Sequence, residues 1–441
     1  MSTRPDVRSS WRVDGTCFRV QALSPEQIPG PESSIGAAGG QDRRASLRLI
    51  LILGALSAFG PLSLDLYLPA LPALAHDLDA TAAQAQLTIT SCLVGLAAGQ
   101  LVAGSLSDSR GRRRPLMIGL VAYTATSLLC ALAPSIGVFI FIRLLQGAAG
   151  AAGIVISRAV ARDLFSGFAL ARFYALLMLV NGLAPILAPV LGGQLLRFGS
   201  WRLGFVALTV LGMALVAVGG LGLKETLPVA RRRAGGLKES LAVFRNLLTD
   251  ASFVGWAVAS GLAIGAMFVY IAASPFVLET VYGVSPQGFS LLFALNALGI
   301  VAAGQASARL VQRLGQLRLL VLGLAGGLAG GLGLLLAVLA GAGLVAVVSA
   351  LFLVVATVGL VLPNATALAL SNQGRVAGSA SALLGLVQFA IGAVVAPLAG
   401  AAGIRPALTM ALLIVALRLG AVFALLIAVR RRPQPVQEPA N

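Results

Sequence analysis

Long apolar segments recur along most of the chain, and short polar segments separate them. A membrane-spanning helix needs about 20 predominantly apolar residues. Segments of this kind lie at approximately 47–69, 85–106, 115–133, 137–158, 170–195, 201–223, 252–274, 287–307, 317–337, 342–367, 378–399 and 406–429. The pattern therefore predicts an all-α membrane protein with twelve transmembrane helices.

The composition supports this class and argues against a nucleic-acid-binding protein. Charged residues make up 11% of the chain and hydrophobic residues 58%, whereas soluble domains are about 25% charged. The net charge of +17 comes from small arginine clusters between apolar segments. It does not come from a basic domain with interleaved aromatic residues. We therefore expect a lipid bilayer, and no nucleic acid, as a partner.

The sequence also lacks the residue patterns of metal sites and active sites. His76 is the only histidine, and Cys17, Cys92 and Cys130 are isolated. This excludes a histidine-based metal site, and no cysteine has the spacing of a metal ligand. No nucleophile–base set or phosphate-binding loop is visible. We expect no metal, no cofactor and no enzymatic activity.

The distribution of basic residues predicts the orientation in the membrane. With the N-terminus in the cytoplasm, the cytoplasmic loops and flanks hold 23 of the 32 Lys and Arg residues. The opposite side holds only Arg197, Arg202 and Arg405. Because cytoplasmic loops are enriched in Lys and Arg, both termini are predicted to be cytoplasmic.

The longest interior polar segment, residues 224–250, divides the predicted spans into two groups of six. We therefore predict a six-helix bundle over 43–223, a cytoplasmic linker over 224–250 and a second six-helix bundle over 251–429. Residues 1–42 are predicted to be a disordered cytoplasmic tail, and residues 430–441 a second cytoplasmic tail.

One acidic residue stands out by its position. Asp65 is the only carboxylate that the pattern places inside an apolar segment, because the other fourteen acidic residues fall in predicted loops, tails or helix ends. A charged side chain at the centre of a membrane helix costs about 3 kcal/mol. A lone acid can remove its charge by taking up a proton, so Asp65 is the first candidate for proton coupling.

Arg143 lies about seven residues into the fourth span. A charge at this depth needs an anion or a water-filled cavity, unless the side chain extends to the outer surface. At about 1.5 Å per residue, Asp65 and Arg143 both fall in the outer half of a core about 30 Å thick. We therefore expect a direct or water-bridged pair between them.

The loop after the second span carries the pattern G-x-L-x-D-x-x-G-R-R. Its residues are Gly104, Leu106, Asp108, Arg110, Gly111, Arg112 and Arg113. A glycine permits close helix approach, and an aspartate at a helix end can pair with arginines or with a neighbouring helix terminus. We expect an ionic latch that holds the cytoplasmic side shut and releases when the halves move. The alternative is an ordinary basic loop.

The fifth span carries a second motif, with Gly182, Pro185, Pro189, Gly192 and Gly193. Proline bends a helix and glycine allows close packing. The motif indicates either a bend with a role in transport or a kink that serves packing alone.

Polar side chains within the spans are candidates for lining a substrate cavity. They are Tyr67, Tyr123, Asn181, Tyr270, Asn296, Asn364 and Gln388. Each is equally suited to a hydrogen bond between helices. Arg418 lies in the middle of the twelfth span, so either it faces the cavity or that span is shifted.

Several motifs resemble those of a known family. The segment PLSLDLYLPALP at 61–72, followed by GQLVAG at 99–104, is similar to the Bcr/CflA branch of drug-resistance transporters in the major facilitator superfamily. The loop after the second span resembles the superfamily's signature loop, although Ser109 stands where arginine is often found. The segment RLLQG from Arg143 resembles its proton-transfer motif, and the fifth-span motif resembles that of proton-driven exporters. The likeness weakens in the second half.

The resemblance implies the major facilitator fold, with helices one and four lining a central cavity. It also implies a monomeric, proton-coupled antiporter of the bacterial inner membrane that exports small drugs, such as amphenicol- or bicyclomycin-like compounds, by alternating access. The partners would be the substrate and protons, with the proton gradient as energy source. One buried acid, faced by at least one buried arginine, favours neutral or zwitterionic substrates over dications.

Two alternatives stay open. The first is a proton-coupled exporter or symporter of an endogenous metabolite, such as a sugar, nucleoside or amino-acid derivative, because the same fold and proton site serve both directions. The second is a receptor or scaffold that transports nothing. In that case Asp65 and Arg143 would be dispensable.

Overall fold

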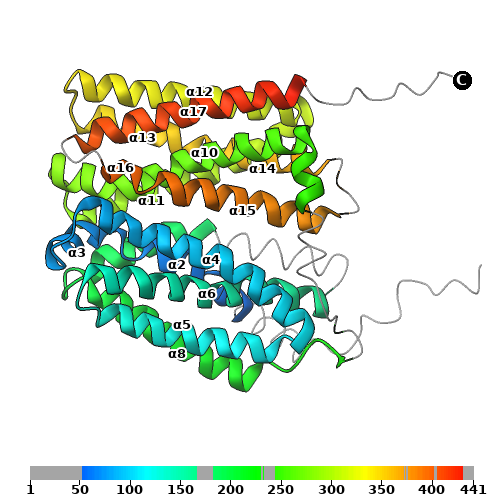
Figure 1. Cartoon of the computed structure of the whole chain (residues 1–441). Coiled ribbons are helices and arrows are strands. Elements are labelled where there is room, and N and C mark those ends of the chain that lie inside the picture. The colour runs from blue at the N-terminus through cyan, green and yellow to red at the C-terminus, as the bar shows by residue number, and fades with distance from the viewer. Residues whose placement is uncertain are drawn as a thin grey trace, which may run out of the picture. The chain divides into compact units, whose positions relative to one another are not determined.

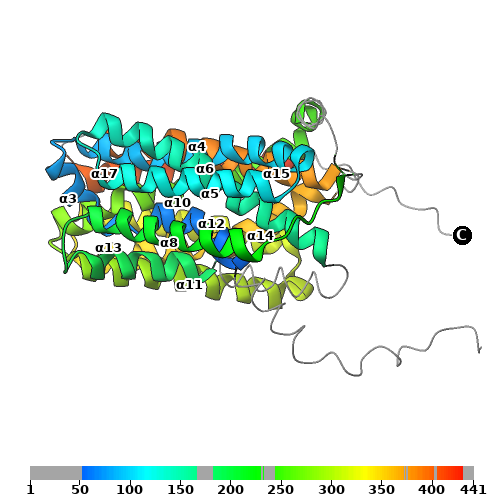
Figure 2. The same cartoon turned by 90° about the horizontal axis from the view of Figure 1, so that it is seen from below.

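The computed structural model describes residues 52–165, 182–229, 232, 244–371, 373, 376–401 and 405–430. In chain order the helices are α2 (Phe59–Asp65), η2 (Leu68–Ala70), α3 (Leu71–Asp77), α4 (Ala82–Arg110), α5 (Arg113–Ala131), α6 (Ile136–Leu164), α8 (Arg202–Gly222), α10 (Ala251–Pro275), η4 (Phe276–Val281), α11 (Pro286–Leu314), α12 (Gln316–Leu339), α13 (Leu344–Ala356), α14 (Val358–Leu370), α15 (Ala377–Val395), α16 (Leu398–Ala401) and α17 (Pro406–Arg430). No strand occurs in these ranges, and the long helices run side by side (Figures 1 and 2).

The described helices account for all twelve predicted spans. Ten helices or helix pairs are long and apolar enough to cross a membrane. The shorter apolar helix Gly182–Leu195 belongs to the predicted fifth span, and α2 with the helical residues 52–57 belongs to the first. The prediction of an all-α membrane fold with twelve spans is confirmed. At the predicted linker, α8 ends at Gly222 and α10 begins at Ala251.

Local sequence explains where α4 begins and ends. Thr81 and Gln84 form a capping box, in which each side chain accepts a hydrogen bond from the other residue's backbone N–H. The helix ends at Gly111, whose φ of +93° favours glycine. A Cβ at Gly111 would also lie 2.5 Å from a Glu225 carboxylate oxygen. The turn after the second span therefore needs glycine for two reasons.

The closest helix packing in the first half joins α4 to α6. A Cβ at Gly95 would lie 2.1 Å from the Leu144 carbonyl oxygen, and one at Gly147 would lie 2.2 Å from that of Cys92. These two glycines let the backbones touch, as small residues do in membrane helices. This packing holds α4 and α6 together where both form part of the wall of the cavity described below.

Two spans are interrupted within the membrane segment. Thr357 separates α13 from α14 in the tenth span. In the seventh span, α10 continues past Pro275 as the π-helix η4 and ends at Val281, seven residues beyond the predicted end at 274. Glu279 therefore lies within an apolar helix. The predicted span ended before this acid, but proline altered the helix without ending it, so Glu279 lies two residues before the helix's last residue.

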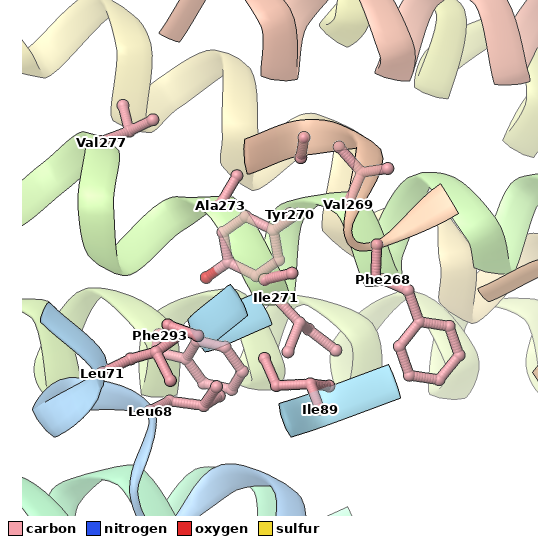
Figure 3. Close-up of a cluster of buried hydrophobic side chains, with 14 of the residues drawn as sticks. Leu68, Leu71, Ile89, Phe268, Val269, Tyr270, Ile271, Ala273, Val277 and Phe293 are labelled. Carbon is pink, nitrogen blue, oxygen red and sulfur yellow. The ribbon is translucent and has the colours of Figure 1, made fainter. Parts of the chain in front are cut away.

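We call the end of the bundle that holds Gly111 and the end of α6 the basic side, and the end that holds α3 and η4 the closed side. At the closed side Leu68 and Leu71 from the first half pack into the same apolar cluster as Val277 and Phe293 from the second (Figure 3). Gly400 of α16 also approaches α4 so closely that a Cβ there would lie 2.7 Å from the Ala83 nitrogen. The two halves are thus sealed together at this side.

Candidate functional site

A cavity of about 860 Å³ lies between the two halves. Its first-half wall comes from α2, α4, α6 and the helix Gly182–Leu195, and its second-half wall from α10, α11 and α13 to α15. Asp65 and Tyr270 line its deep part, while Arg158 and Arg162, near the end of α6, line the part toward the basic side. Most of the wall is apolar, including Met267, Phe268, Ile271, Phe293 and Phe389. The cavity therefore reaches toward the side opposite the apolar seal.

Asp65 is the acidic residue that lines this cavity. It is the last residue of α2 and is 5% exposed. Within the described residues it forms no ion pair and no hydrogen bond. Tyr270 of α10 lies on the second-half wall of the same cavity. An acid placed this way can exchange a proton through the cavity with the basic side.

Arg143 does not form the expected direct pair with Asp65. Its side chain is fully buried and donates to the Ser63 carbonyl oxygen at 2.8 Å, and to the side-chain oxygen of Gln146. It also lies 4.7 Å from the ring centroid of Tyr67. Because residues two apart on a helix differ by about 200°, α2 presents Ser63 to α6 and Asp65 to the cavity.

The end of α2 explains this contact. A helix leaves its last carbonyl groups without intrahelical partners, and these carry a partial negative charge. Arg143 supplies a donor and a positive charge at this end. The alternative in which Arg143 extends to the outer surface is also excluded, because the side chain is 0% exposed.

Three of the seven predicted cavity residues line the cavity: Tyr270, Asn296 and Gln388. Asn296 donates to the Tyr270 hydroxyl at 2.7 Å, and Gln388 donates to Ser260 at 3.3 Å. Tyr270 and Asn296 thus form one polar group on the wall that faces Asp65.

The other predicted cavity residues serve helix packing or lie elsewhere. Tyr67 shares a hydrogen bond of 2.8 Å with Thr88, and Tyr123 shares one of 2.7 Å with Ser63. Asn364 donates to Ser307 at 2.7 Å. None of these three lines the cavity. Asn181 lies outside the described residues.

Arg418 does not face the cavity, and its span is not shifted. It lies in the middle of α17, is 0% exposed, and donates to the Val354 carbonyl oxygen at 2.6 Å. That carbonyl lies at the interruption of the tenth span, where Thr357 also donates to it. Gly327 of α12 makes room, because a Cβ there would lie 2.7 Å from the guanidinium carbon. Both buried arginines thus bind carbonyl groups near the ends of helices, Arg143 near the end of α2 and Arg418 near the end of α13.

The loop after the second span forms a polar cluster at the basic side. Arg112 is 6% exposed and donates to Ser107, Asp108 and Asp163, with 2.9 Å to Asp163. These contacts raise the pKa of Arg112 in spite of its burial. The backbone N–H groups of Arg112 and Arg113 donate to Glu225. The cluster ties the ends of α4 and α6 to the segment after α8.

The described partners in this cluster all belong to the first half of the chain. In this arrangement the cluster therefore braces one bundle and does not bridge the two. Gly104 contacts Val155 of α6, Leu106 is half-buried, and Arg110 is exposed. Asp163 was not among the predicted site residues. The sequence RAVARD nevertheless places this acid at the end of the fourth span, on the same side of the membrane as the arginines of the loop after the second span.

We expect Glu225→Gln to weaken this cluster in a pH-dependent way. Burial would raise the pKa of Glu225, but backbone N–H groups of Leu227, Arg112 and Arg113 and the charge of Arg232 outweigh it, so the pKa is lowered. The ionised form then stabilises the fold above about pH 4, and this is lost as pH falls through the lowered pKa. Because Glu225 is exposed, the loss is about 1 kcal/mol or less.

Thermal unfolding in detergent tests this expectation. The variant should melt below the wild type at neutral pH, and the difference should shrink at acidic pH. Lys224→Gln, on the neighbouring exposed residue, is the control. An equal difference at every pH would contradict the role of the charge.

The helix Gly182–Leu195 packs against both halves. Pro185 lines the cavity and Pro189 is buried. A Cβ at Gly192 would lie 1.8 Å from the Leu66 carbonyl oxygen, and one at Gly193 would lie 2.3 Å from the Ser290 hydroxyl of α11. Gly182 faces Val301, which also belongs to α11. The motif thus supplies close contacts near the closed side.

Trp201 and Arg202 anchor the start of α8 at the closed side. Both donate to the Asp77 carboxylate, Trp201 at 2.9 Å. The hydrogen bond from Trp201 and, to a smaller extent, the one from Arg202 lower the pKa of Asp77. The contact joins α3 to α8 within the first half.

Comparisons with known proteins agree with this arrangement. Residues 51–397 match the Major Facilitator Superfamily. The uncharacterized MFS-type transporter YdgK of Bacillus subtilis is 41% identical over 80% of this chain and 89% of its own length. The bicyclomycin resistance protein homolog of Haemophilus influenzae is 32% identical over 81% of this chain and 89% of its own.

A solved structure shows the same fold. It is that of a bacterial homolog of the human lysosomal transporter Spinster, which matches with a TM-score of 0.70 and 16% identity over 90% of this chain and all of that one. Together, the sequence match, the twelve spans and the cavity between two sealed halves show that the chain belongs to the major facilitator superfamily, as a drug-resistance transporter of the Bcr/CflA type.

Proposed function

We propose that this protein is a proton-coupled antiporter that exports small drugs across the bacterial inner membrane, with both termini in the cytoplasm. The observation that carries the proposal is Asp65, which lies on the wall of the cavity between the halves and has no ion-pair partner among the described residues. An acid that no cation holds ionised can alternate between charged and neutral forms.

In an alternating-access cycle, Asp65 would bind a proton on one side of the membrane and release it on the other. In the arrangement described, the apolar seal separates Asp65 from the closed side, and the cavity connects it to the basic side. A proton bound from the acidic exterior in the opposite arrangement would be released here to the cytoplasm, and a drug would enter the same cavity. Each ligand shifts the equilibrium only through its different affinity for the two arrangements.

The charges on the cavity wall support neutral or zwitterionic substrates. Asp65 lies deep, whereas Arg158 and Arg162 lie toward the basic side. A dication entering from that side would meet two positive charges before it reached one carboxylate. Uncharged compounds of the bicyclomycin or amphenicol kind fit the largely apolar wall. The drug-resistance relative supports the same class.

A charge-graded drug panel tests this function. In a pump-deficient bacterium, we expect the chain to lower accumulation of an amphenicol by at least about fivefold and that of a lipophilic dication by less than about twofold. An uncoupler should abolish the effect. Accumulation that falls when the gradient is abolished would indicate an importer and overturn export. Equal export of dications would contradict the substrate class.

A further inference from the structure

A second acidic residue in the membrane segment lies outside the cavity. Glu279 is on the π-helix η4, between Pro275 and the end of the seventh span at Val281. It does not line the cavity that holds Asp65. Its neighbours on the same turn, Val277 and Leu278, are 0% and 1% exposed and belong to the apolar seal. The carboxyl group therefore lies at the edge of the seal between the halves.

The Glu279 side chain is half-buried, and within the described part of the chain its carboxyl group forms no ion pair or hydrogen bond. Its Oε1 atom is shielded from solvent and forms no hydrogen bond. A buried charge without a partner is costly. In the sealed arrangement the neutral, protonated form of Glu279 is therefore the favoured one.

No charged group on the elements packed against η4 changes this conclusion. Those elements are α3, α10, α11 and α17. The titratable or charged side chains on or directly next to these elements are His76, Asp77, Asp79, Tyr270, Arg309, Arg313, Arg405, Arg418 and Arg430, with Tyr282 following η4 in the chain. None forms an ion pair or a hydrogen bond with Glu279, and Asp77 is occupied by Trp201 and Arg202.

The packing of η4 depends on the arrangement of the two halves. It contacts α3, which belongs to the first half, while η4 itself belongs to the second. Opening the closed side must separate these two elements and admit water to their contact. Water stabilises the ionised carboxylate. The charge of Glu279 and the state of the seal are therefore linked.

We propose that Glu279 is a second proton-binding residue of the transport cycle, one that takes up a proton when the closed side seals and returns it to the same side on opening. This inference rests on the proposed antiport function. Because Glu279 lies outside the cavity, its proton does not cross the membrane. Glu279 thus sets how the pH on that side controls closure, without adding to the protons carried per drug.

A reporter cysteine at Ala75 tests the proposal without requiring transport. Ala75 is 6% exposed on α3, next to η4 in the seal. The native Cys17, Cys92 and Cys130 are first replaced, so that Ala75→Cys carries the only thiol. The rate at which this thiol is alkylated is then measured in purified protein between about pH 5 and 8, once with Glu279 and once with Glu279→Gln. The ratio of the two rates at each pH cancels the intrinsic pH dependence of the thiol.

Ionised Glu279 should favour the arrangement in which the closed side has opened. Glutamine is always neutral and should not favour it. We expect the ratio of labelling rates, Glu279 protein to Gln variant, to rise at least about fivefold from acid to alkaline pH. Glu279→Asp should keep most of this rise. A ratio that is independent of pH would overturn the proposal. So would a fall in protons exchanged per drug in Glu279→Gln, because it would mean that the proton crosses.

The same labelling in an Asp65→Asn background separates this proposal from the proposed function. The rise should persist there, since Glu279 and not Asp65 faces the seal. Loss of the rise in that background would assign the pH dependence to Asp65 and overturn the role of Glu279.

Discussion

Asp65→Asn should reduce proton-driven drug export by at least about 100-fold. Asparagine has nearly the same shape and is neutral, like a protonated aspartate, but it cannot release a proton into the cavity. The folded structure should survive, since Asp65 has no ion pair or hydrogen bond to lose among the described residues. Drug binding should change only a few-fold, because the rest of the cavity wall is unchanged.

Vesicle assays separate coupling from binding in this variant. Drug-induced proton movement should disappear, while exchange of labelled for unlabelled drug, which moves no net proton, should continue. Asp79→Asn is the matched control, because Asp79 lies outside the spans and its φ of +46° suits asparagine. Export by Asp65→Asn at near wild-type rate would refute the role of Asp65. It would favour a transporter that does not use this acid.

The sequence was sufficient for the spans and for the placement of Asp65. Apolar length identifies helices because every backbone polar group in the membrane must be satisfied internally. The resemblance implied that the first helix lines a central cavity, and Asp65 of this helix lies on the cavity wall. What the sequence could not supply was the rotation of α2, which turns Ser63 and not Asp65 toward Arg143.

The partners of both buried arginines were unpredictable for one shared reason. A search of the sequence for compensating charges considers acidic side chains, whereas Arg143 and Arg418 bind backbone carbonyl groups. Those carbonyls are available only because the first span ends at Asp65 and the tenth is interrupted at Thr357. Helix ends within a membrane segment are set by local packing, and single-sequence hydropathy does not resolve them.

At Glu279 the sequence indicates the end of a helix, whereas in the structure the helix continues. The polar pair Glu279–Thr280 after Pro275 has the pattern of a helix end, and the predicted seventh span ends before it, at 274. The helix instead widens into a π-turn and continues to Val281. A proline that follows many good helix formers can alter the hydrogen-bond register without ending the helix when tertiary packing holds the segment. Here the apolar seal supplies that packing.

Gly400→Val should hold the closed side open and reduce transport by at least about tenfold. Gly400 of α16 lies against the backbone of α4, and a Cβ there would come within 2.7 Å of the Ala83 nitrogen and of the Gln86 side-chain oxygen. Backbone cannot rotate away as a side chain can, so sealing would cost a few kcal/mol, the usual range for overpacking being about 1–3 kcal/mol. Each 1.4 kcal/mol changes the population of the sealed arrangement about tenfold.

Folding should tolerate the same substitution, because α16 and α4 belong to different halves and must separate whenever this side opens. The Ala75→Cys reporter should therefore be labelled faster in Gly400→Val, with thermal unfolding little changed. Gly137→Val is the control, since Gly137 is exposed and no described residue lies within 4 Å of a Cβ there. Gly193→Ala should have a smaller effect than Gly400→Val, because its nearest neighbour is the Ser290 hydroxyl, a side-chain atom that can rotate. Unchanged protection of Ala75→Cys in Gly400→Val would show that the seal does not depend on this contact.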